Sequence, residues 1–468
     1  MSARYLTTTL PYVNADPHLG HALEFVEADC FARAARLAGD EVFFNIGTDE
    51  HGAKIARKAE EEGRSPQDYV DEYAARFRAF ADRLEISYDS FIRTTDPAHM
   101  RAAQEFWKRC ESAGDIYKAA YEIKYCVGCE LEKTESELVE GRCPLHPTLE
   151  IELQEEENYY FRFSKYRDAL LAHYAAQPDF VLPEGRRREI VALAEAGLKD
   201  FSISRRREKM SWGVPVPDDD EHVMYVWFDA LVNYVSVIGW PDDEERFKKW
   251  WPAIQFAGKD NLRQQTAMWQ AMLLSAGLPF SRQILIHGNI ISGGQKMSKT
   301  LGNVIDPMIV ARKYGAETLR YVLLRHASPF EDSDLTLEGI HEHYTAHLVN
   351  GLGNLVARVM KLAEQYLPAP IATPSWHDRW DFIDTFEFNE ELNHIWQEIG
   401  VIDQVMTNEK PFAVIKTDEE RGRRLIAQMV EQLYIVARRL APFMPATSEK
   451  ILTAIKENKK PDNLFPRL

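Results

Sequence analysis

Two short motifs in this sequence could bind phosphate, and the first is His18-Leu19-Gly20-His21. It lies where an apolar segment passes through a loop into a helical pattern. A helix N-terminus presents backbone N–H groups and the positive end of the helix dipole, and both attract phosphate. His18 and His21 are spaced i, i+3 and project on one side of the first turn, while Gly20 allows a phosphate to approach the backbone. Taken alone, such a tetrapeptide is more often structural than catalytic.

The second motif is Lys296-Met297-Ser298-Lys299-Thr300, which follows Gly293-Gly294 and precedes Gly302. Two lysines on a glycine-flanked loop suit a mobile clamp on a polyphosphate, because charge that develops in phosphoryl transfer needs preplaced cations. A solvated basic loop is the alternative. The sequence has no G-x-x-x-x-G-K-[ST] loop and no complete G-x-G-x-x-G, so ordinary NTPase and dinucleotide-binding functions lose their main support.

A third motif has the spacing of a metal site. Cys126 and Cys129 are followed after 13 residues by Cys143 and then by His146, which predicts a structural zinc knuckle closed by four ligands. Buried thiols are the alternative, and they fit Cys30 and Cys110, which lie on helical patterns. His343 and His347 are also spaced i, i+4, but no third ligand is obvious and a helix surface is the better interpretation.

The elements that must position these motifs begin with a βαβ unit. Residues 4–9 predict a strand, 11–17 a loop, 19–37 a helix ended by Gly39, and 41–46 a second strand. This succession is typical of the opening of a parallel, Rossmann-type sheet. Residues 54–114 are mostly amphipathic helix, and 118–165 form a loop-rich insertion.

A second α/β pattern follows, with strands expected at 223–228, 254–257 and 284–287 and a helix at 263–276. From about 335 onward the pattern is helical, interrupted at 368–370 and at Pro411. The predicted fold class is α/β, a Rossmann-type parallel sheet split by a zinc-containing insertion and followed by an all-helical domain. The expected domains are 1–115 and 221–335 for the two halves of the sheet, 116–220 for the insertion with its knuckle at 126–146, and 336–468 for the helical domain.

Composition and charge restrict the class of protein further. The chain has 468 residues, of which 45% are hydrophobic and 28% charged, as in folded globular proteins of about three domains. A net charge of −17 argues against a uniformly basic nucleic-acid surface, although residues 421–468 have a local excess of Lys and Arg.

The longest nearly apolar run, 223–240, contains Asp229, so no membrane span is expected. Five cysteines and no visible secretory signal predict a cytoplasmic location.

The two phosphate motifs, one in each half of a split Rossmann sheet, resemble those of class I aminoacyl-tRNA synthetases. The segments that make the likeness closest to the methionyl-tRNA synthetases are Leu10-Pro11-Tyr12, Asp49-Glu50-His51-Gly52, 225–230, Gly258-Lys259-Asp260 and 299–303. The resemblance implies a ligase that activates L-methionine with ATP to methionyl-adenylate and transfers it to the 3′ end of tRNA(Met), releasing AMP and diphosphate. It also implies Mg²⁺ with ATP and one structural Zn²⁺ per chain, and we expect a monomer.

The same resemblance implies a role for each matching residue. The catalytic group would comprise His18, His21, Lys296 and Lys299, and the ATP-binding group Gly20, Glu24, Asp260, His287, Gly288 and Lys299. The methionine-binding group would comprise Thr9, Leu10, Tyr12, Asp49, Trp227, Ala230, Tyr234 and Gln265. Cys126, Cys129, Cys143 and His146 would bind the metal, and Asn354, Arg358 and Phe412 would read the anticodon.

Some features leave alternatives open. Asn261 and Gln265 stand where many members of the family have isoleucine and histidine, and Leu231 stands where some have proline. The sequence therefore specifies the type of reaction more closely than the amino-acid substrate. A relative that charges another small apolar amino acid is one alternative, although those enzymes carry a much larger editing insertion. A catalytically silent RNA-binding paralogue is another. Core packing is the alternative role for Tyr12, Trp227 and Phe412.

Overall fold

The centre of the protein is a six-stranded parallel sheet. In the computed structural model, which describes residues 2–129, 131–133, 137–297 and 303–468, the strand order is β3-β2-β1-β12-β13-β7. Every neighbouring pair is parallel. The strands are β1 (Ala3–Thr8), β2 (Glu41–Thr48), β3 (Ser90–Arg93), β7 (Val181–Leu182), β12 (Ala253–Gly258) and β13 (Gln283–His287). The sheet therefore combines β1, β2 and β3, from residues 3–93, with β12 and β13, from residues 253–287, as expected for a split Rossmann sheet.

Helix α1 (Leu19–Leu37) connects β1 to β2 and confirms the predicted βαβ unit. Its apolar side is buried along nearly its whole length, since residues from Leu19 to Ala35 pack on the sheet. Gly39 ends the turn with φ +93°, a conformation that favours glycine. Residues 54–114 form the predicted helices α2 (Ala53–Glu61), α3 (Pro66–Arg83) and α4 (Pro97–Ser112), but the short edge strand β3 between α3 and α4 was not predicted.

The insertion has two small antiparallel sheets of its own. One has the order β5-β4-β6-β8, from β4 (Ile116–Cys126), β5 (Leu131–Glu132), β6 (Glu152–Phe161) and β8 (Phe201–Ser202). The other has the order β10-β11-β9, from β9 (Ser204–Arg206), β10 (Pro215–Val216) and β11 (Asp219–Met224). Between β6 and β8 in the chain lie η2 (Phe163–Tyr166), α5 (Arg167–Ala176) and α6 (Glu184–Ala196), and also β7, which joins the central sheet.

The expected strand at 223–228 is wrong. Only its first two residues belong to a strand, β11, which pairs antiparallel with β9 and β10 outside the central sheet. The chain then turns at Tyr225, whose N–H donates to the Ile203 carbonyl at 2.8 Å, into helix α7 (Val226–Leu231). A short apolar run fits a buried strand and a buried helix equally well, so periodicity cannot separate them. Helices α8 (Asn233–Ser236) and α9 (Glu244–Trp250) follow.

The second half of the sheet carries most of the remaining predicted elements. The helix expected at 263–276 is present as a π-helical segment, η4 (Gln264–Met268), that continues into α10 (Trp269–Ser275), after the short turn η3 (Lys259–Asn261). A three-stranded sheet follows β13, with the order β15-β14-β16 and the strands β14 (Ile290–Ser292), β15 (Gln295–Lys296) and β16 (Ser333–Asp334). Helices α11 (Pro307–Tyr314) and α12 (Ala316–His326) lie between β15 and β16.

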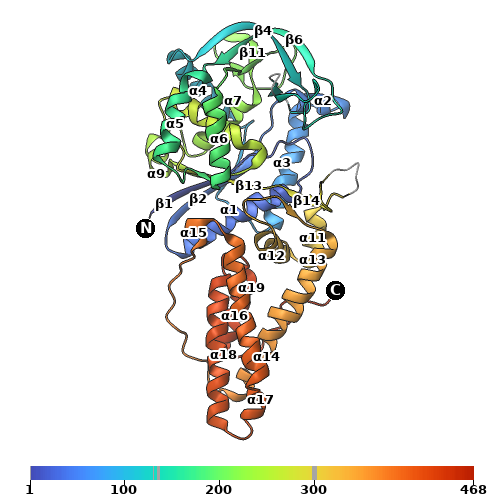
Figure 1. The fold of residues 1–468 in the computed structure, drawn as a ribbon, viewed down its shortest axis with the longest axis vertical. Helices are drawn as coiled ribbons and strands as arrows, with labels where there is room; N and C mark the ends of the chain where they lie inside the picture. The colour runs from blue at the N-terminus through green and yellow to red at the C-terminus, as the bar shows by residue number, and fades with distance from the viewer. Residues whose placement is uncertain (1, 130, 134–136, 298–302) are drawn as a thin grey trace.

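The C-terminal part is a helical bundle that extends from the α/β body, with α17 at its far end (Figure 1). Its elements are α13 (Leu337–His343), η5 (Tyr344–Gly353), α14 (Asn354–Tyr366), α15 (Phe382–Thr385), α16 (Phe388–Asn408), α17 (Pro411–Val414), α18 (Glu419–Leu440) and α19 (Pro445–Glu457). Among the residues that the structure describes, no strand occurs after β16, as predicted.

A buried ion pair joins the bundle to the sheet. Arg320 on α12 and Asp29 on α1 are both fully buried, with Arg320 Nη1 2.6 Å from Asp29 Oδ2. The guanidinium also donates to the carbonyls of Phe443 at 3.0 Å and Pro442 at 3.1 Å, between α18 and α19. Burial alone would raise the pKa of Asp29, but the charges of Arg320 and Arg33 and the hydrogen bonds from Ser87 together lower it. This contact fixes the bundle against α1, which begins at the histidine motif.

Within the described part of the chain, no helix is both long enough and apolar enough to cross a bilayer.

Candidate active site

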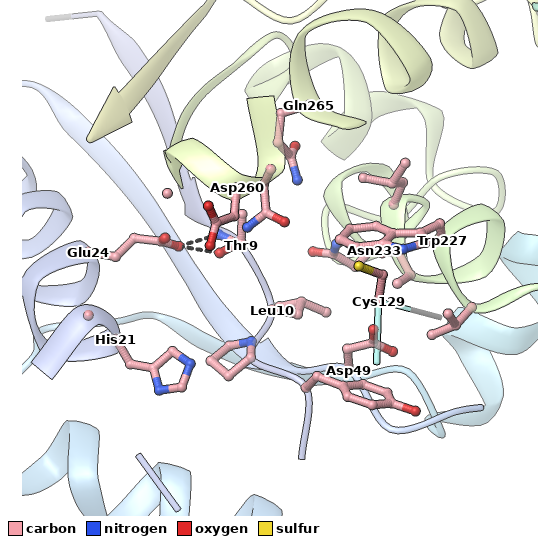
Figure 2. Close-up of a pocket in the computed structure, with 18 of the residues that line it drawn as sticks. Thr9, Leu10, His21, Glu24, Asp49, Cys129, Trp227, Asn233, Asp260 and Gln265 are labelled. Carbon is pink, nitrogen blue, oxygen red and sulfur yellow. Dashed lines mark hydrogen bonds between the residues drawn. The ribbon is translucent and has the colours of Figure 1, made fainter. Parts of the chain in front are cut away.

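A cavity of about 340 Å³ opens where the central strands end. Thr9 follows β1, Asp49 follows β2, and His287 is the last residue of β13, so the carboxyl ends of three parallel strands contribute to one wall. Ligands of open α/β sheets bind at this edge. Figure 2 shows Glu24, Thr9 and Asp260 on one side of the cavity and Asp49, Trp227 and Asn233 on the other, with Leu10 between them.

The structure brings most of the predicted site residues to this cavity. The lining includes Thr9, Leu10, Tyr12, His18, Gly20, His21, Glu24, Asp49, Trp227, Ala230, Tyr234, Asp260, Gln265 and His287. Gly288 is not part of the lining, and Asn289 takes that place. A Cβ at Gly288 would lie 2.2 Å from the Glu331 backbone, so this glycine serves a close chain crossing. Lys299 lies outside the described residues.

The histidine motif forms its own helix cap. His18 is the N-cap of α1, and its Nδ1 accepts the N–H groups of Gly20 at 3.1 Å and His21 at 3.4 Å. In return, the His18 N–H donates to His21 Nδ1 at 3.3 Å. The sequence predicted free N–H groups here for phosphate; instead, the His18 ring occupies two of them. Gly20 permits this fold-back, since a Cβ there would lie 3.0 Å from the His18 ring.

This cap fixes the tautomer of both rings. Because each Nδ1 accepts a backbone N–H, the proton of each neutral imidazole must lie on Nε2, which is then a donor. Burial, with the charge of Lys296 adding to it, lowers the pKa of His18 to about 4. Burial also lowers the pKa of His21 well below its usual value. The rings stack with centroids 3.7 Å apart, so the motif presents two neighbouring neutral N–H donors.

Glu24 connects the two halves of the split sheet. Its Oε1 accepts the N–H and the hydroxyl of Thr9, both at 2.6 Å, and its Oε2 lies 3.1 Å from His287 Nε2. Burial alone would lower the pKa of His287, but the hydrogen bond to Glu24 and the charge of Glu27 raise it to about 9. Burial raises the pKa of the adjacent Glu27 to about 8. A polar, hydrogen-bonding end of the cavity is the result.

A buried carboxylate positions the opposite end. Asp229 on α7 is fully buried, and it lies 2.7 Å from His51 Nδ1 and 3.0 Å from His99 Nε2. His51 follows Asp49 by two residues, and Asp229 follows Trp227 by two, so this contact holds the loop with Asp49 against the helix with Trp227. The sequence flagged the segment around His51 only by resemblance and gave His99 no role, since the contact joins positions far apart in the chain.

Next to its aromatic walls, the cavity borders a network of buried polar side chains that hydrogen-bond to one another. Gln265 Nε2 donates to the Tyr234 hydroxyl at 2.8 Å, and Gln265 Oε1 accepts from Gln255 Nε2 at 3.3 Å. All three side chains are buried. Tyr12 and Trp227 are only half-buried and face the cavity, so neither is an ordinary core residue. Polarizable aromatic walls of this kind suit a thioether side chain.

The predicted metal ligands converge at the rim of the same cavity. All four ligand atoms of Cys126, Cys129, Cys143 and His146 lie within 4.8 Å of one another. Cys129 Sγ is 3.4 Å from Cys143 Sγ and 3.2 Å from His146 Nδ1. Two ligands of one tetrahedral Zn²⁺ are separated by about 3.3–3.8 Å, so the cluster fits a metal of that size. Cys129 and Gly128 line the cavity, which the sequence did not predict (Figure 2).

The start of the lysine loop lies beside the cavity, next to the lining residue Asp260. Lys296 on β15 is exposed, with Nζ 3.7 Å from Asp260 Oδ2. The turn before it is held by Asp334, whose two oxygens accept the N–H groups of Gly293 at 2.8 Å and Gly294 at 2.7 Å. Lys54, from α2, lines the cavity as a further cation that the sequence did not single out.

The three residues expected to read an anticodon lie in the bundle. Asn354 is exposed at the start of α14, and Arg358 Nη1 pairs with Asp403 on α16 at 2.9 Å. Phe412 lies on α17, and 45% of its surface is exposed, which rules out the core role considered for it. A large exposed aromatic ring at the end of a bundle is suited to stacking on an unpaired base.

Comparison with known proteins agrees with this geometry. The family model described as tRNA synthetases class I (M) matches residues 4–150 and 146–360. The chain is therefore a class I tRNA synthetase. It is 40% identical over 479 residues to the methionine–tRNA ligase of Thermotoga maritima, covering 98% of this chain and 76% of that protein. It is 41% identical over 470 residues to the enzyme of Thermosynechococcus vestitus, covering 95% and 88%.

A solved structure gives the same result. The Mycobacterium tuberculosis methionyl-tRNA synthetase in complex with methionyl-adenylate superposes with a TM-score of 0.90 at 36% identity, covering 97% of this chain and 93% of that one. The chain belongs to the methionyl-tRNA synthetase family.

Proposed function

We propose that this protein activates L-methionine with ATP and transfers the methionyl group to tRNA(Met). The observation that carries the proposal is the single cavity in which Asp49, the aromatic walls and the histidine pair come together. An acidic residue suits an α-ammonium group, the aromatic rings suit a thioether, and paired N–H donors suit phosphate. One cavity thus offers a partner to each part of methionyl-adenylate.

In the first step the methionine carboxylate attacks the α-phosphorus of ATP, and diphosphate leaves. Asp49 and the rings of Tyr12 and Trp227 would hold methionine, so that its carboxylate points along the cavity toward the phosphates. His18 and His21 would donate from Nε2 to the phosphate oxygens, where negative charge increases in the transition state. Neutral donors need no change in protonation at cellular pH, given the lowered pKa of both rings.

The other end of the cavity would hold the nucleotide. Glu24 and Asp260 would bind the ribose hydroxyls, and the segment from His287 to Asn289 would bind adenine; the position of Glu24, Asp260, His287 and Asn289 in the cavity wall supports these roles. Lys296 and Lys299 would neutralise the departing diphosphate, together with the Mg²⁺ that enters with ATP. The ion pair between Lys296 and Asp260, a residue that lines the cavity, supports this role for Lys296.

In the second step a ribose hydroxyl of the terminal adenosine of tRNA attacks the methionyl carbon, and AMP leaves. Asn354, Arg358 and Phe412 would bind the anticodon at the end of the bundle.

The free thiols of the chain support a cytoplasmic location. The proposal includes a monomer, which light scattering of the purified protein tests. Charging of tRNA(Met) transcripts with labelled methionine tests the complete reaction, and no product above the level without ATP would refute it.

The cysteine cluster would hold a structural zinc. Three sulfurs and one imidazole nitrogen form a common Zn²⁺ donor set, and the distances between them suit tetrahedral binding. The metal would supply folding energy to the knuckle and keep Cys129 and Gly128 in the wall of the cavity. Elemental analysis of freshly purified protein should find about one zinc per chain at this site, and its absence would refute the assignment.

A further inference from the structure

A second group of possible metal ligands lies at the junction between the α/β body and the bundle. His326 is the last residue of α12, His343 is the last residue of α13, and His347 lies one turn further, in η5. One ligand atom from each of the three lies within 4.8 Å of the other two. The sequence showed only the pair at 343 and 347; the third histidine comes from a helix 17 residues earlier.

We propose that His326, His343 and His347 form a binding site for a divalent metal of the Zn²⁺ class. Three imidazole nitrogens with a solvent-accessible fourth position are a known Zn²⁺ arrangement, and imidazole also suits Cu²⁺ and Ni²⁺. The rings are half-buried, so one side of the cluster is open to a water ligand. This site is separate from the cysteine knuckle and takes no part in the proposed reaction.

The three rings lie close together, and one possible ligand atom of each is within 4.8 Å of the other two. The rings of His326 and His343 are stacked with centroids 3.6 Å apart, and His347 lies 5.4 Å from the first and 5.3 Å from the second. Two nitrogens bound to one tetrahedral Zn²⁺ are about 3.3–3.4 Å apart. To bind one ion together, the stacked rings of His326 and His343 would have to turn until their lone pairs converge.

Neighbouring groups orient the rings as partners of metal ligands do. The Tyr321 hydroxyl lies 2.8 Å from His347 Nδ1 and 3.3 Å from His326 Nε2, which leaves the other nitrogen of each ring for an ion. Arg325 donates to the same hydroxyl at 2.6 Å and to Asn393 Oδ1 at 3.1 Å, and these two hydrogen bonds fix the direction of its guanidinium. The carbonyls that end α12 add negative potential beside His326.

A bound ion would join α12 of the α/β body to the helix that continues through η5 into α14. That helix carries Asn354 and Arg358, so the metal would stiffen the connection between the two parts of the molecule. We therefore expect zinc to raise the melting temperature and to leave methionine-dependent ATP–diphosphate exchange unchanged.

The test is a zinc titration of the full-length protein with its cysteine site filled, in competition with a chromophoric chelator. We expect one additional equivalent per chain. The double variant His343→Ala/His347→Ala should bind this equivalent at least about tenfold more weakly, in line with the loss of metal ligands. His341→Ala is the matched control, because His341 lies on the same helix outside the cluster and should not change the titration.

A second measurement does not depend on how the variants fold. In the wild-type protein, zinc should protect His326, His343 and His347 from diethyl pyrocarbonate and leave His341 and His377 reactive, as read by mass spectrometry. The proposal is wrong if no second equivalent binds, if the second equivalent survives in a folded double variant, or if zinc protects none of the three rings. In those cases the histidines only pack against one another.

Discussion

Glu24 and His287 lie 263 positions apart in the chain, yet His287 Nε2 is 3.1 Å from Glu24 Oε2. This contact joins helix α1 to strand β13 at the end of the cavity that we propose binds the nucleotide. The protonation of His287 and of the nearby Glu27 should make stability depend on pH, because folding raises the pKa of His287 to about 9 and that of Glu27 to about 8.

Stability should therefore fall as the pH rises from about 6.5 to 9. The folded protein holds protons on both groups that the unfolded chain loses near their ordinary pKa values of about 6.5 and 4.3, so this stabilisation is lost as pH passes the folded pKa values. In Glu27→Gln the loss should be smaller by at least about 1 kcal/mol, the value of a one-unit pKa shift. Melting temperatures across this pH range test it; the exposed control Glu60→Gln should follow the wild type. An unchanged slope in Glu27→Gln would contradict the prediction.

The buried pair between Arg320 and Asp29 should be the most sensitive link between the bundle and the sheet. Arg320→Met leaves the buried Asp29 with Arg33 as its remaining cation, at 2.7 Å, and leaves the carbonyls of Phe443 and Pro442 without their donor. We therefore expect it to lower the free energy of unfolding by about 3 kcal/mol, the lower end of the range for breaking a buried pair. Urea denaturation provides the measurement. Arg423→Ala removes an exposed pair with Glu419 and should change stability by less than about 1 kcal/mol. Equal effects of the two variants would show that burial of the pair is unimportant.

The lysine loop should be needed for adenylation. Lys299→Ala should reduce methionine-dependent ATP–diphosphate exchange by at least about 10²-fold, which is typical of losing one preplaced charge donor. Methionine binding should change much less, because the lysine acts on diphosphate. Lys361→Ala removes an exposed charge from α14 and serves as the control. Near-normal exchange in Lys299→Ala would remove this loop from the mechanism.

Phe412 should contribute to tRNA binding and not to adenylation. If its exposed ring stacks on an anticodon base, Phe412→Ala should weaken tRNA binding by about 1–3 kcal/mol. Exchange should stay intact, since that half-reaction needs no tRNA. Leu337→Ala, which removes another exposed apolar side chain, should bind tRNA normally. Equal binding by the two variants would count against base stacking at Phe412.

Much of the α/β body could be predicted from local patterns. The limits of α1 followed from its apolar periodicity and from Gly39, and β12 and β13 from short apolar runs. The same reasoning failed at 223–228, because an apolar run of that length does not distinguish α7 from a strand. The strand β3 has only four residues between two helices, so it left no separate pattern.

The site residues were accessible from motifs, whereas the contacts among them were not. The spacing of His18 and His21 indicated a phosphate site, but not that their rings cap the helix and fix each other's tautomer. Likewise, the approach of Cys129 to the cavity, the pairing of His51 with Asp229 and the position of His326 beside His343 depend on tertiary structure. No spacing rule reports such long-range contacts.

Exchange of diphosphate into ATP with a panel of amino acids tests the central claim most directly. Methionine should support exchange at least about 10²-fold faster than leucine, isoleucine or valine, the discrimination that a shaped apolar pocket provides. The proposed activation of methionine and the assignment of Asp49, Trp227 and Gln265 to methionine binding both require this result. Exchange supported better by another amino acid, or no exchange with methionine, would contradict it.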